Sequence, residues 1–243
     1  MIRQALILAA GQGTRLRASA DDLPKPLQLV GRVPLLERTA RALVGAGVTR
    51  IVVVTGFRAE LVRDAAHALR DLAEIELVHN PDFELANGVS VAVGGRALTG
   101  PFLLSMVDHV YGPEIPRALA VQDLSAADLY LATDPRIDEV RDLDDATKVR
   151  TDGGRIVDIG KAIAAYDRID CGVFAAGAAL LDCLDELRAA RGDCSLSDGV
   201  RRLAARGRAR AVDIGDAFWQ DVDTPADREH AERALAHPWL AQQ

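Results

Sequence analysis

The sequence is poor in cysteine and in aromatic residues. Among its 243 residues are three cysteines, and Phe, Trp and Tyr together make up 4%. Cys171, Cys183 and Cys194 are odd in number, and none belongs to a CxxC pair. This pattern argues against a disulfide framework and against a zinc site. It favours reduced thiols and a cytoplasmic location.

Positive charge and long apolar runs are scarce as well. The chain has 29 Lys and Arg against 36 Asp and Glu, a formal net charge of -7. That balance disfavours a nucleic-acid partner, which usually needs a basic face. No apolar run approaches the ~20 residues that span a bilayer. The run near the N-terminus ends at Gly11, too early for a signal peptide. We expect a soluble protein with no direct membrane insertion.

The apolar residues that are present alternate between strand-like and helix-like patterns. Apolar runs predict buried strands at residues 5–9, 51–55, 75–78 and 102–107, and periodic stretches predict helices at 36–46, 60–72 and 89–98. This βαβ alternation predicts right-handed crossovers between parallel strands. We therefore expect an α/β, Rossmann-like three-layer fold, with a mixed, mostly parallel sheet and helices on both faces.

The second half of the chain is less regular. Asp152-Gly153-Gly154 separates the strand-like segments 148–151 and 155–159, which predicts a hairpin. The other predicted elements are strands at 129–133, 172–176, 209–213 and 218–222, helices at 180–190 and 197–205, and a terminal helix opened by Thr224-Pro225. We find no repeat and no linker. We expect a single domain over residues 1–243, with residues 125–175 on the substrate side.

A glycine-rich turn follows the first predicted strand. The string Leu8-Ala9-Ala10-Gly11-Gln12-Gly13-Thr14-Arg15-Leu16 precedes Pro24-Lys25-Pro26-Leu27. Gly11 and Gly13 let backbone N–H groups approach a polyphosphate, and Arg15 and Lys25 could neutralise departing pyrophosphate. The spacing is neither GxGxxG, because Leu16 replaces the third glycine, nor GxxxxGK[ST]. An ordinary strand–helix turn with incidental basic residues is the alternative.

This string resembles the phosphate-binding loop of the sugar-phosphate nucleotidyltransferase superfamily. The resemblance implies that Arg15 and Lys25 contact the reacting phosphates. It also implies that the preceding residues bind a nucleoside triphosphate: Leu8, Ala9, Ala10, Gly11, Gly13 and Thr14.

Carboxylates close two predicted strands. Asp108 directly follows the strand at 102–107, and Asp221 and Asp223 close the strand at 218–222. Mg²⁺ is commonly bound by one or two carboxylates together with substrate phosphates, so we expect Asp108 and Asp223 to hold Mg²⁺, with Asp221 as the second choice. In an extended segment only side chains on one face can reach the metal. The alternation of side chains along a strand should turn His109 to the other face, where we expect it to support the structure or to contact the metal ligands from behind.

Motifs in the second half resemble the CTP:inositol-1-phosphate cytidylyltransferases. They are Val107-Asp108-His109-Val110-Tyr111, Ala146-Thr147-Lys148-Val149-Arg150, Ile159-Gly160-Lys161 and Phe218-Trp219-Gln220-Asp221-Val222-Asp223-Thr224-Pro225. The resemblance runs from about residue 4 to 235 and implies CTP and inositol 1-phosphate as substrates. Many members of that family carry a membrane phosphatidyltransferase-like domain. This chain lacks one, so we expect it either to act with a separate membrane partner or to use another acceptor.

The three lysines of the chain, Lys25, Lys148 and Lys161, all fall in these motifs. Lys148 and Lys161 flank the predicted hairpin and could offer two ammonium groups to an acceptor phosphate, although two solvated surface lysines are the alternative. For the nucleotide, the resemblance favours base or ribose contacts from Asn87, Gly88 and Ser90, with Thr55 as a further candidate. Helix capping by Asn87 is the alternative there.

The expected reaction is Mg²⁺-dependent transfer of CMP from CTP to 1L-myo-inositol 1-phosphate, which yields CDP-inositol and pyrophosphate. Phosphocholine or glucose 1-phosphate could replace the acceptor. A choline site would use aromatic faces, which this sequence has few of, whereas a polyol would use carboxylates such as Asp144, Asp145 or Asp170. An alternative of another class is a non-catalytic nucleotide-sensing domain, which would lack either the metal carboxylates or the basic pair.

Overall fold

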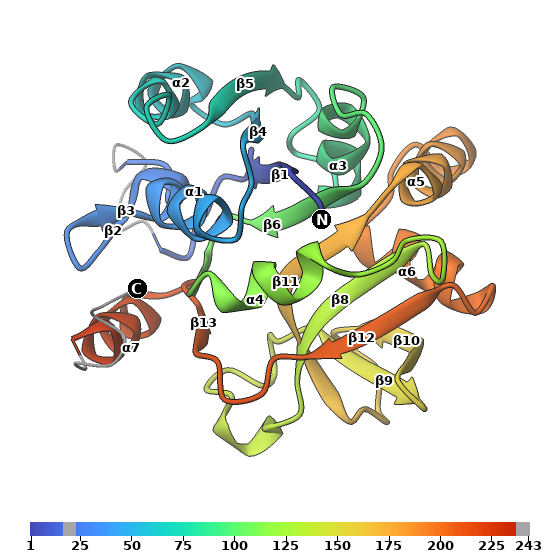
Figure 1. Cartoon of the computed structure of the whole chain (residues 1–243). Coiled ribbons are helices and arrows are strands. Elements are labelled where there is room, and N and C mark those ends of the chain that lie inside the picture. Colours follow the sequence, from blue (N-terminus) through green and yellow to red (C-terminus); the bar gives the residue numbers. More distant parts are fainter. Residues whose placement is uncertain (17–22, 237–243) are drawn as a thin grey trace.

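The computed structural model describes residues 1–16 and 23–236 of the chain. Nine strands form the main sheet, in the order β5-β4-β1-β6-β11-β8-β12-β10-β9 (Figure 1). They are β1 (Gln4–Ala9), β4 (Arg50–Thr55), β5 (Glu74–His79), β6 (Phe102–Met106), β8 (Leu129–Asp134), β9 (Lys148–Asp152), β10 (Arg155–Gly160), β11 (Arg168–Ala176) and β12 (Ala209–Asp213). Two small sheets pair β2 (Leu29–Val30) with β3 (Val33–Pro34), and β7 (His109–Tyr111) with β13 (Trp219–Asp221).

The sheet is parallel in its first half and mixed in its second. Strands β5, β4, β1 and β6 run parallel. Strand β11 lies antiparallel between β6 and β8, and β12 runs parallel to β8. The β9–β10 hairpin closes the far edge, with Gly153 and Gly154 at φ 56° and 78°, as a tight two-residue turn requires. The predicted α/β fold with a mixed sheet and the predicted hairpin are confirmed.

Helices cover both faces of the sheet. They are α1 (Leu35–Gly45), α2 (Ala59–His67), α3 (Asn87–Gly95), α4 (Glu114–Ala120), α5 (Ala178–Arg191), α6 (Leu196–Ala205) and α7 (Pro225–Leu235), with short 3₁₀ turns at Lys25–Leu27 and Ile137–Glu139. Alternate residues of β1 enter different cores, because successive side chains point to opposite faces. Leu6 and Leu8 pack in the core under α3, α5 and α6, and Ile7 packs in the core under α1, α2 and α4 (Figure 1).

Several boundaries differ from the sequence-based predictions. Helix α2 ends at His67 instead of residue 72. Beyond it, backbone N–H groups bond to carbonyls three residues earlier, so the chain continues in tighter turns, which still bury Leu69. Helix α4 and strand β7 were not predicted, since each is too short to show a period. Thr224 caps α7 through a reciprocal pair with Asp227, with Pro225 at the first helical position, as predicted.

Within residues 1–16 and 23–236, no helix combines the length and the apolar character that crossing a bilayer requires. The single domain over 1–243, with residues 125–175 on the substrate side, stays a prediction, and residues 17–22 and 237–243 lie outside the described chain.

Candidate active site

The carboxyl ends of β1 and β6 bring the glycine-rich turn and the acidic residues together. The turn begins directly after Ala9, and Asp108 follows β6 by two residues. Strand β7 then pairs with β13, which places His109 opposite Asp221. The backbone N–H of Val222 donates to the carbonyl of Asp108 at 2.9 Å. Segments far apart in the sequence therefore meet at one edge of the sheet, where open α/β sheets bind their ligands.

Lys25 lies at the centre of this edge. Its side chain is buried, and its ammonium group forms ion pairs with Asp108, at 2.7 Å, and with Asp223. Burial opposes the charge on Lys25, but the carboxylates of Asp108, Asp221 and Asp223 outweigh that effect and raise the pKa of the lysine. Lys25 is therefore held as a cation between the two carboxylates that the sequence predicted for the metal.

Gly13 allows Lys25 to take this position. It has φ +60°, in the left-handed region, and a Cβ at residue 13 would overlap the Cβ of Lys25. The backbone of the glycine-rich turn and the side chain of Lys25 are thus in direct contact, which only glycine permits.

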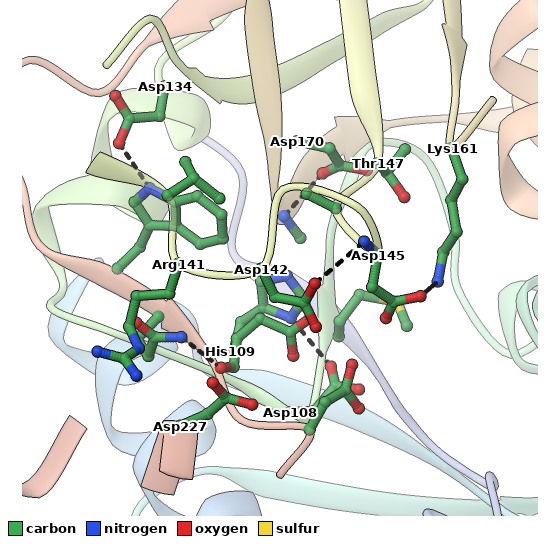
Figure 2. A pocket seen from close by; sticks show the side chains of 18 of the residues that line it. Asp108, His109, Asp134, Arg141, Asp142, Asp145, Thr147, Lys161, Asp170 and Asp227 are labelled. Atoms are coloured by element: carbon green, nitrogen blue, oxygen red, sulfur yellow. Dashed lines mark hydrogen bonds and ion pairs between the residues drawn. The ribbon is translucent and has the colours of Figure 1, made fainter. Parts of the chain in front are cut away.

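Arg15 joins the glycine-rich turn to the far side of the site. Its guanidinium donates to Asp223 and to Asp145, each at 2.7 Å, and its side chain is half exposed. Asp145 also receives the ammonium group of Lys161 at 2.5 Å (Figure 2). The cations predicted to bind phosphates therefore converge, and Asp145 serves two of them as a common counter-ion.

His109 does not point away from the carboxylates, contrary to the prediction from strand alternation. Its Nδ1 lies 2.9 Å from Asp108, because residues 107 and 108 form a turn between β6 and β7 and interrupt the alternation. Its ring stacks on Trp219, with centroids 5.9 Å apart. Burial lowers the pKa of His109, but Asp221 and Asp108 raise it to about 9.

Both Asp221 and Asp223 line the larger cavity, and residues i and i+2 of an extended segment share a face. Desolvation, together with Asp108 and Asp223, raises the pKa of Asp221 to about 7 despite the nearby His109. Burial would raise the pKa of Asp108, but Lys25 and His109 hold it well below its ordinary value.

The donor set fits a divalent cation. Ligand atoms of Asp108, His109 and Asp221 lie within 4.8 Å of one another. Oδ1 of Asp221 is buried and has no hydrogen-bond partner among the described residues. A buried carboxylate oxygen without a donor is costly unless a ligand satisfies it. Carboxylates converging with an imidazole are a set that divalent cations accept.

Two cavities meet at these residues. The smaller, about 330 Å³, is lined by the glycine-rich turn, including Leu8, Ala10, Gly11, Gly13 and Thr14. The larger, about 770 Å³, extends over β11, β13 and the loop at residues 141–147 (Figure 2). Arg15, Asp108 and Asp223 line both cavities. One cavity thus presents the predicted nucleotide loop and the other the predicted acceptor side.

The two lysines of the hairpin have different surroundings. Lys161 is 56% exposed and lines the larger cavity. Lys148 is buried, and its ammonium group donates to the carbonyls of Lys161, Asp144 and Ala146 at 3.0–3.4 Å. Lys148 is absent from the described residues that line the two cavities. The structure therefore does not present two ammonium groups to the larger cavity, because the ammonium group of Lys148 binds carbonyls of the loop at residues 144–146 and of Lys161, which follows β10.

The residues predicted to contact the base or ribose are also divided. Asn87 lines both cavities, and its Oδ1 accepts the Leu196 N–H at 2.9 Å, so it joins α3 to α6 and does not cap its own helix. Ser90 lines the smaller cavity. Gly88 packs against the backbone at Cys194, where a Cβ would lie 2.6 Å from the carbonyl oxygen. Thr55 and Ala9 are buried outside the described lining of either cavity.

Sequence reasoning missed a group behind His109. The buried Asp134 accepts the indole N–H of Trp219 at 2.7 Å and the Nε–H of Arg136 at 2.9 Å. Trp219 in turn stacks on His109. The signal was available, because Asp134 follows the predicted strand at 129–133 just as Asp108 follows its own strand.

Asp170 gives a prediction for stability. Burial raises the pKa of this carboxyl to about 6, from an ordinary 3.8, although the Gly172 N–H opposes the shift. Between about pH 4 and 6 the folded protein keeps a proton that the unfolded chain has released, so stability falls as pH rises through this window. Asp170→Asn should therefore unfold with a free energy about 2 kcal/mol higher than wild type at pH 8, and about equal at pH 4. Urea titrations at both pH values measure this, and a variant no more stable at pH 8 would contradict the assigned cost.

Comparisons with known proteins identify the family of the chain. A family model described as a MobA-like NTP transferase domain matches residues 5–212. The bifunctional IPC transferase and DIPP synthase of Rubrobacter xylanophilus is 40% identical over 235 residues, which are 95% of this chain and 51% of that protein. CMP-5'-(3-aminopropyl)phosphonate synthase of Streptomyces rubellomurinus is 32% identical, over 97% of this chain and 39% of that protein.

Among solved structures, the inositol-1-phosphate CTP transferase from T. maritima is similar with a TM-score of 0.83 and 28% identity, over 97% of both chains. This chain spans about half of the Rubrobacter relative and less of the Streptomyces one. The resemblance to nucleotidyltransferases is confirmed by the family match, which covers most of the sequence. The chain belongs to the family of the MobA-like NTP transferase domain.

Proposed function

We propose that this chain transfers CMP from CTP to 1L-myo-inositol 1-phosphate and forms CDP-inositol and pyrophosphate. The observation that carries the proposal is the convergence of Arg15, Lys25, Asp108 and Asp223 where two cavities meet. The choice of substrates is supported by the likeness to the T. maritima inositol-1-phosphate CTP transferase.

The reaction joins a nucleotide in the smaller cavity to an acceptor in the larger one. A phosphate oxygen of the acceptor attacks the α-phosphorus of CTP, a new P–O bond forms, and the bond to the β-phosphate breaks to release pyrophosphate. The attacking oxygen is already anionic, so no general base is needed. Lys25 and Arg15 orient the triphosphate and neutralise the charge that develops on the leaving group. Lys161, on the wall of the larger cavity, binds the acceptor phosphate.

Mg²⁺ is part of the proposal. We propose Asp108 and Asp223 as its ligands, with Asp221 as the second choice, although the described cluster that could hold a metal contains His109 in place of Asp223. The bound ion would neutralise phosphate charge and polarise the α-phosphate. Lys148 supports the loop at residues 144–146 through its carbonyl contacts. Asn87 and Ser90 are the side chains that we propose to contact the nucleoside.

A pyrophosphate-release assay tests the proposal. CTP, UTP, dTTP and ATP are each combined with inositol 1-phosphate, phosphocholine and glucose 1-phosphate in the presence of Mg²⁺. We expect CTP with inositol 1-phosphate to give the highest kcat/KM by at least about 100-fold, a ratio that a site built to hydrogen-bond one substrate can exceed. If no pair of nucleotide and acceptor released pyrophosphate, an enzymatic function would be contradicted. If another acceptor were preferred, that acceptor would take the place of inositol 1-phosphate in the proposed reaction.

A second acceptor belongs in the same assay. The Streptomyces relative is named for an aminopropylphosphonate, so 3-aminopropylphosphonate is tested beside inositol 1-phosphate. The Rubrobacter relative is named as bifunctional, and this chain matches about half of it. We also propose that the product, CDP-inositol, passes in the cytoplasm to a membrane phosphatidyltransferase.

A further inference from the structure

Three carboxylates near the acceptor side have different partners. Both oxygens of Asp145 are used, one by Arg15 and one by Lys161. The Asp144 side chain is exposed, and it is absent from the described residues that line the larger cavity. Asp170 lines that cavity and forms no ion pair with any described residue. The structure thus leaves Asp170 available to a ligand.

The position of Asp170 is fixed by an irregular stretch of β11. The register between β11 and β8 shifts between Asp170 and Phe174. The backbone N–H of Asp170 donates to the carbonyl of Thr147 at 2.9 Å, and the Gly172 N–H donates to Oδ1 of Asp170 at 2.7 Å (Figure 2). Gly172 has φ +73°, and the His109 ring fills the place of its missing side chain, 2.6 Å from where a Cβ would lie. The Gly172 N–H therefore holds one oxygen of the carboxylate in place.

The other oxygen of Asp170 has no donor. Among residues 1–16 and 23–236, the Gly172 N–H is the one hydrogen-bond donor recorded for this carboxylate. Of the cations that line the cavity, Lys161 pairs with Asp145, Arg136 pairs with Asp134, and Arg141 contacts His230. The second oxygen of Asp170 is therefore open to a hydrogen-bond donor that enters the cavity.

We propose that Asp170 is a specificity-determining residue whose free oxygen accepts hydrogen bonds from ring hydroxyl groups of the acceptor, which selects polyol phosphates. This inference rests on the proposed function and deepens it. A carboxylate only accepts hydrogen bonds, so the part of the acceptor that meets it carries O–H or N–H groups. Its negative charge repels the phosphate, which is thereby directed to the opposite end, towards Arg15 and Lys161.

A hydroxyl ligand suits this position better than an ammonium group. Quaternary and other ammonium ligands are usually held against aromatic faces. The indole ring of Trp219, on the wall of the same cavity, is stacked by His109. A neutral hydroxyl also loses less hydration on entering a partly buried site than a charged amine does.

The experiment compares two variants and two acceptors. Asp170→Asn keeps an oxygen for the Gly172 N–H but replaces the free acceptor oxygen with an amide group. Asp144→Asn removes the same charge from the exposed side chain nearby. Turnover with CTP is measured with inositol 1-phosphate and with cyclohexyl phosphate, which has the ring and the phosphate but no hydroxyl groups. Binding of inositol 1-phosphate alone is followed by calorimetry.

We expect Asp170→Asn to raise KM for inositol 1-phosphate at least about 10-fold with KM for CTP unchanged, the loss of about one charge-assisted hydrogen bond. Cyclohexyl phosphate should not respond, so the preference for inositol 1-phosphate over it should fall by the same factor. Asp144→Asn should behave as wild type. Calorimetry should show the same weakening of binding without CTP.

Three results would overturn the inference. The first is an unchanged KM for inositol 1-phosphate in Asp170→Asn, and the second is an equal loss for both acceptors. The third comes from assaying the same two variants with 3-aminopropylphosphonate: a loss of turnover with that acceptor alone would assign the carboxylate to an ammonium group. Failure of the proposed function looks different, because wild type itself would then neither bind nor turn over inositol 1-phosphate.

Discussion

Replacing Lys25 with alanine should lower kcat for pyrophosphate release by about 10³-fold, the upper range for loss of one preorganised group that stabilises transition-state charge. Lys25 is the buried cation at the junction of the two cavities, in contact with Asp108 and Asp223. Single-turnover kinetics with saturating CTP and acceptor measure the effect.

The same substitution removes the partner of two carboxylates, and breaking a buried ion pair can cost about 3 kcal/mol or more of stability. Without Lys25, the carboxylates of Asp108 and Asp223 repel each other. The double variant Lys25→Ala, Asp223→Asn removes one of the two charges, so it should regain stability without regaining turnover. Lys25→Arg, which keeps the charge on a larger group, should retain more activity than either. Near-normal turnover in Lys25→Ala would remove the central part of the proposed function.

Gly13→Ala should lower kcat at least about 100-fold, because a misplacement of about 1 Å in a reacting group has effects of this size. The new methyl group would overlap Lys25 at its Cβ, which a lysine cannot avoid by bending its far end. The lysine or the phosphate loop must therefore shift. Turnover and thermal unfolding are measured on the same preparation.

The hairpin supplies a matched control. Gly153 has φ +56° against +60° at Gly13, and a Cβ there would meet no atom within 4 Å. Both alanine variants bear the cost of the left-handed backbone, about 1–2 kcal/mol. Gly153→Ala should lose this stability and keep its turnover. If both variants stay active, the contact between Gly13 and Lys25 has no part in the reaction.

Local chemistry was enough to predict much of the fold. The run at residues 5–9 is buried on both faces, Gly153-Gly154 turns a hairpin, and Thr224-Pro225 starts a helix. The pairing of strands that are far apart in the sequence could not be predicted. Polar residues at the start of β11 conceal a nine-residue strand, and its antiparallel position between β6 and β8 depends on contacts that no local period records.

The candidate site shows the same division. Residue types next to strand ends pointed to Asp108, Asp221 and Asp223. Asp108 follows the parallel strand β6, whereas Asp221 and Asp223 reach the same place through the antiparallel pairing of β13 with β7. The alternation rule failed for His109, because it assumes an unbroken strand and residues 107 and 108 form a turn. Lys148 and Lys161 looked equivalent in the sequence, yet only a three-dimensional structure reveals that carbonyl oxygens surround one of them.

The scarcity of lysine has a practical consequence for handling the protein. Two of the three lysines are buried, so amine-directed reagents will find Lys161 and the amino terminus first. Acylation would neutralise Lys161 and leave Asp145 to Arg15 alone. Immobilisation or dye labelling through amines would therefore attach to the wall of the larger cavity and obstruct it. Surface studies should couple the chain by an affinity tag, and acylation of Lys161 offers a ready way to block the acceptor side.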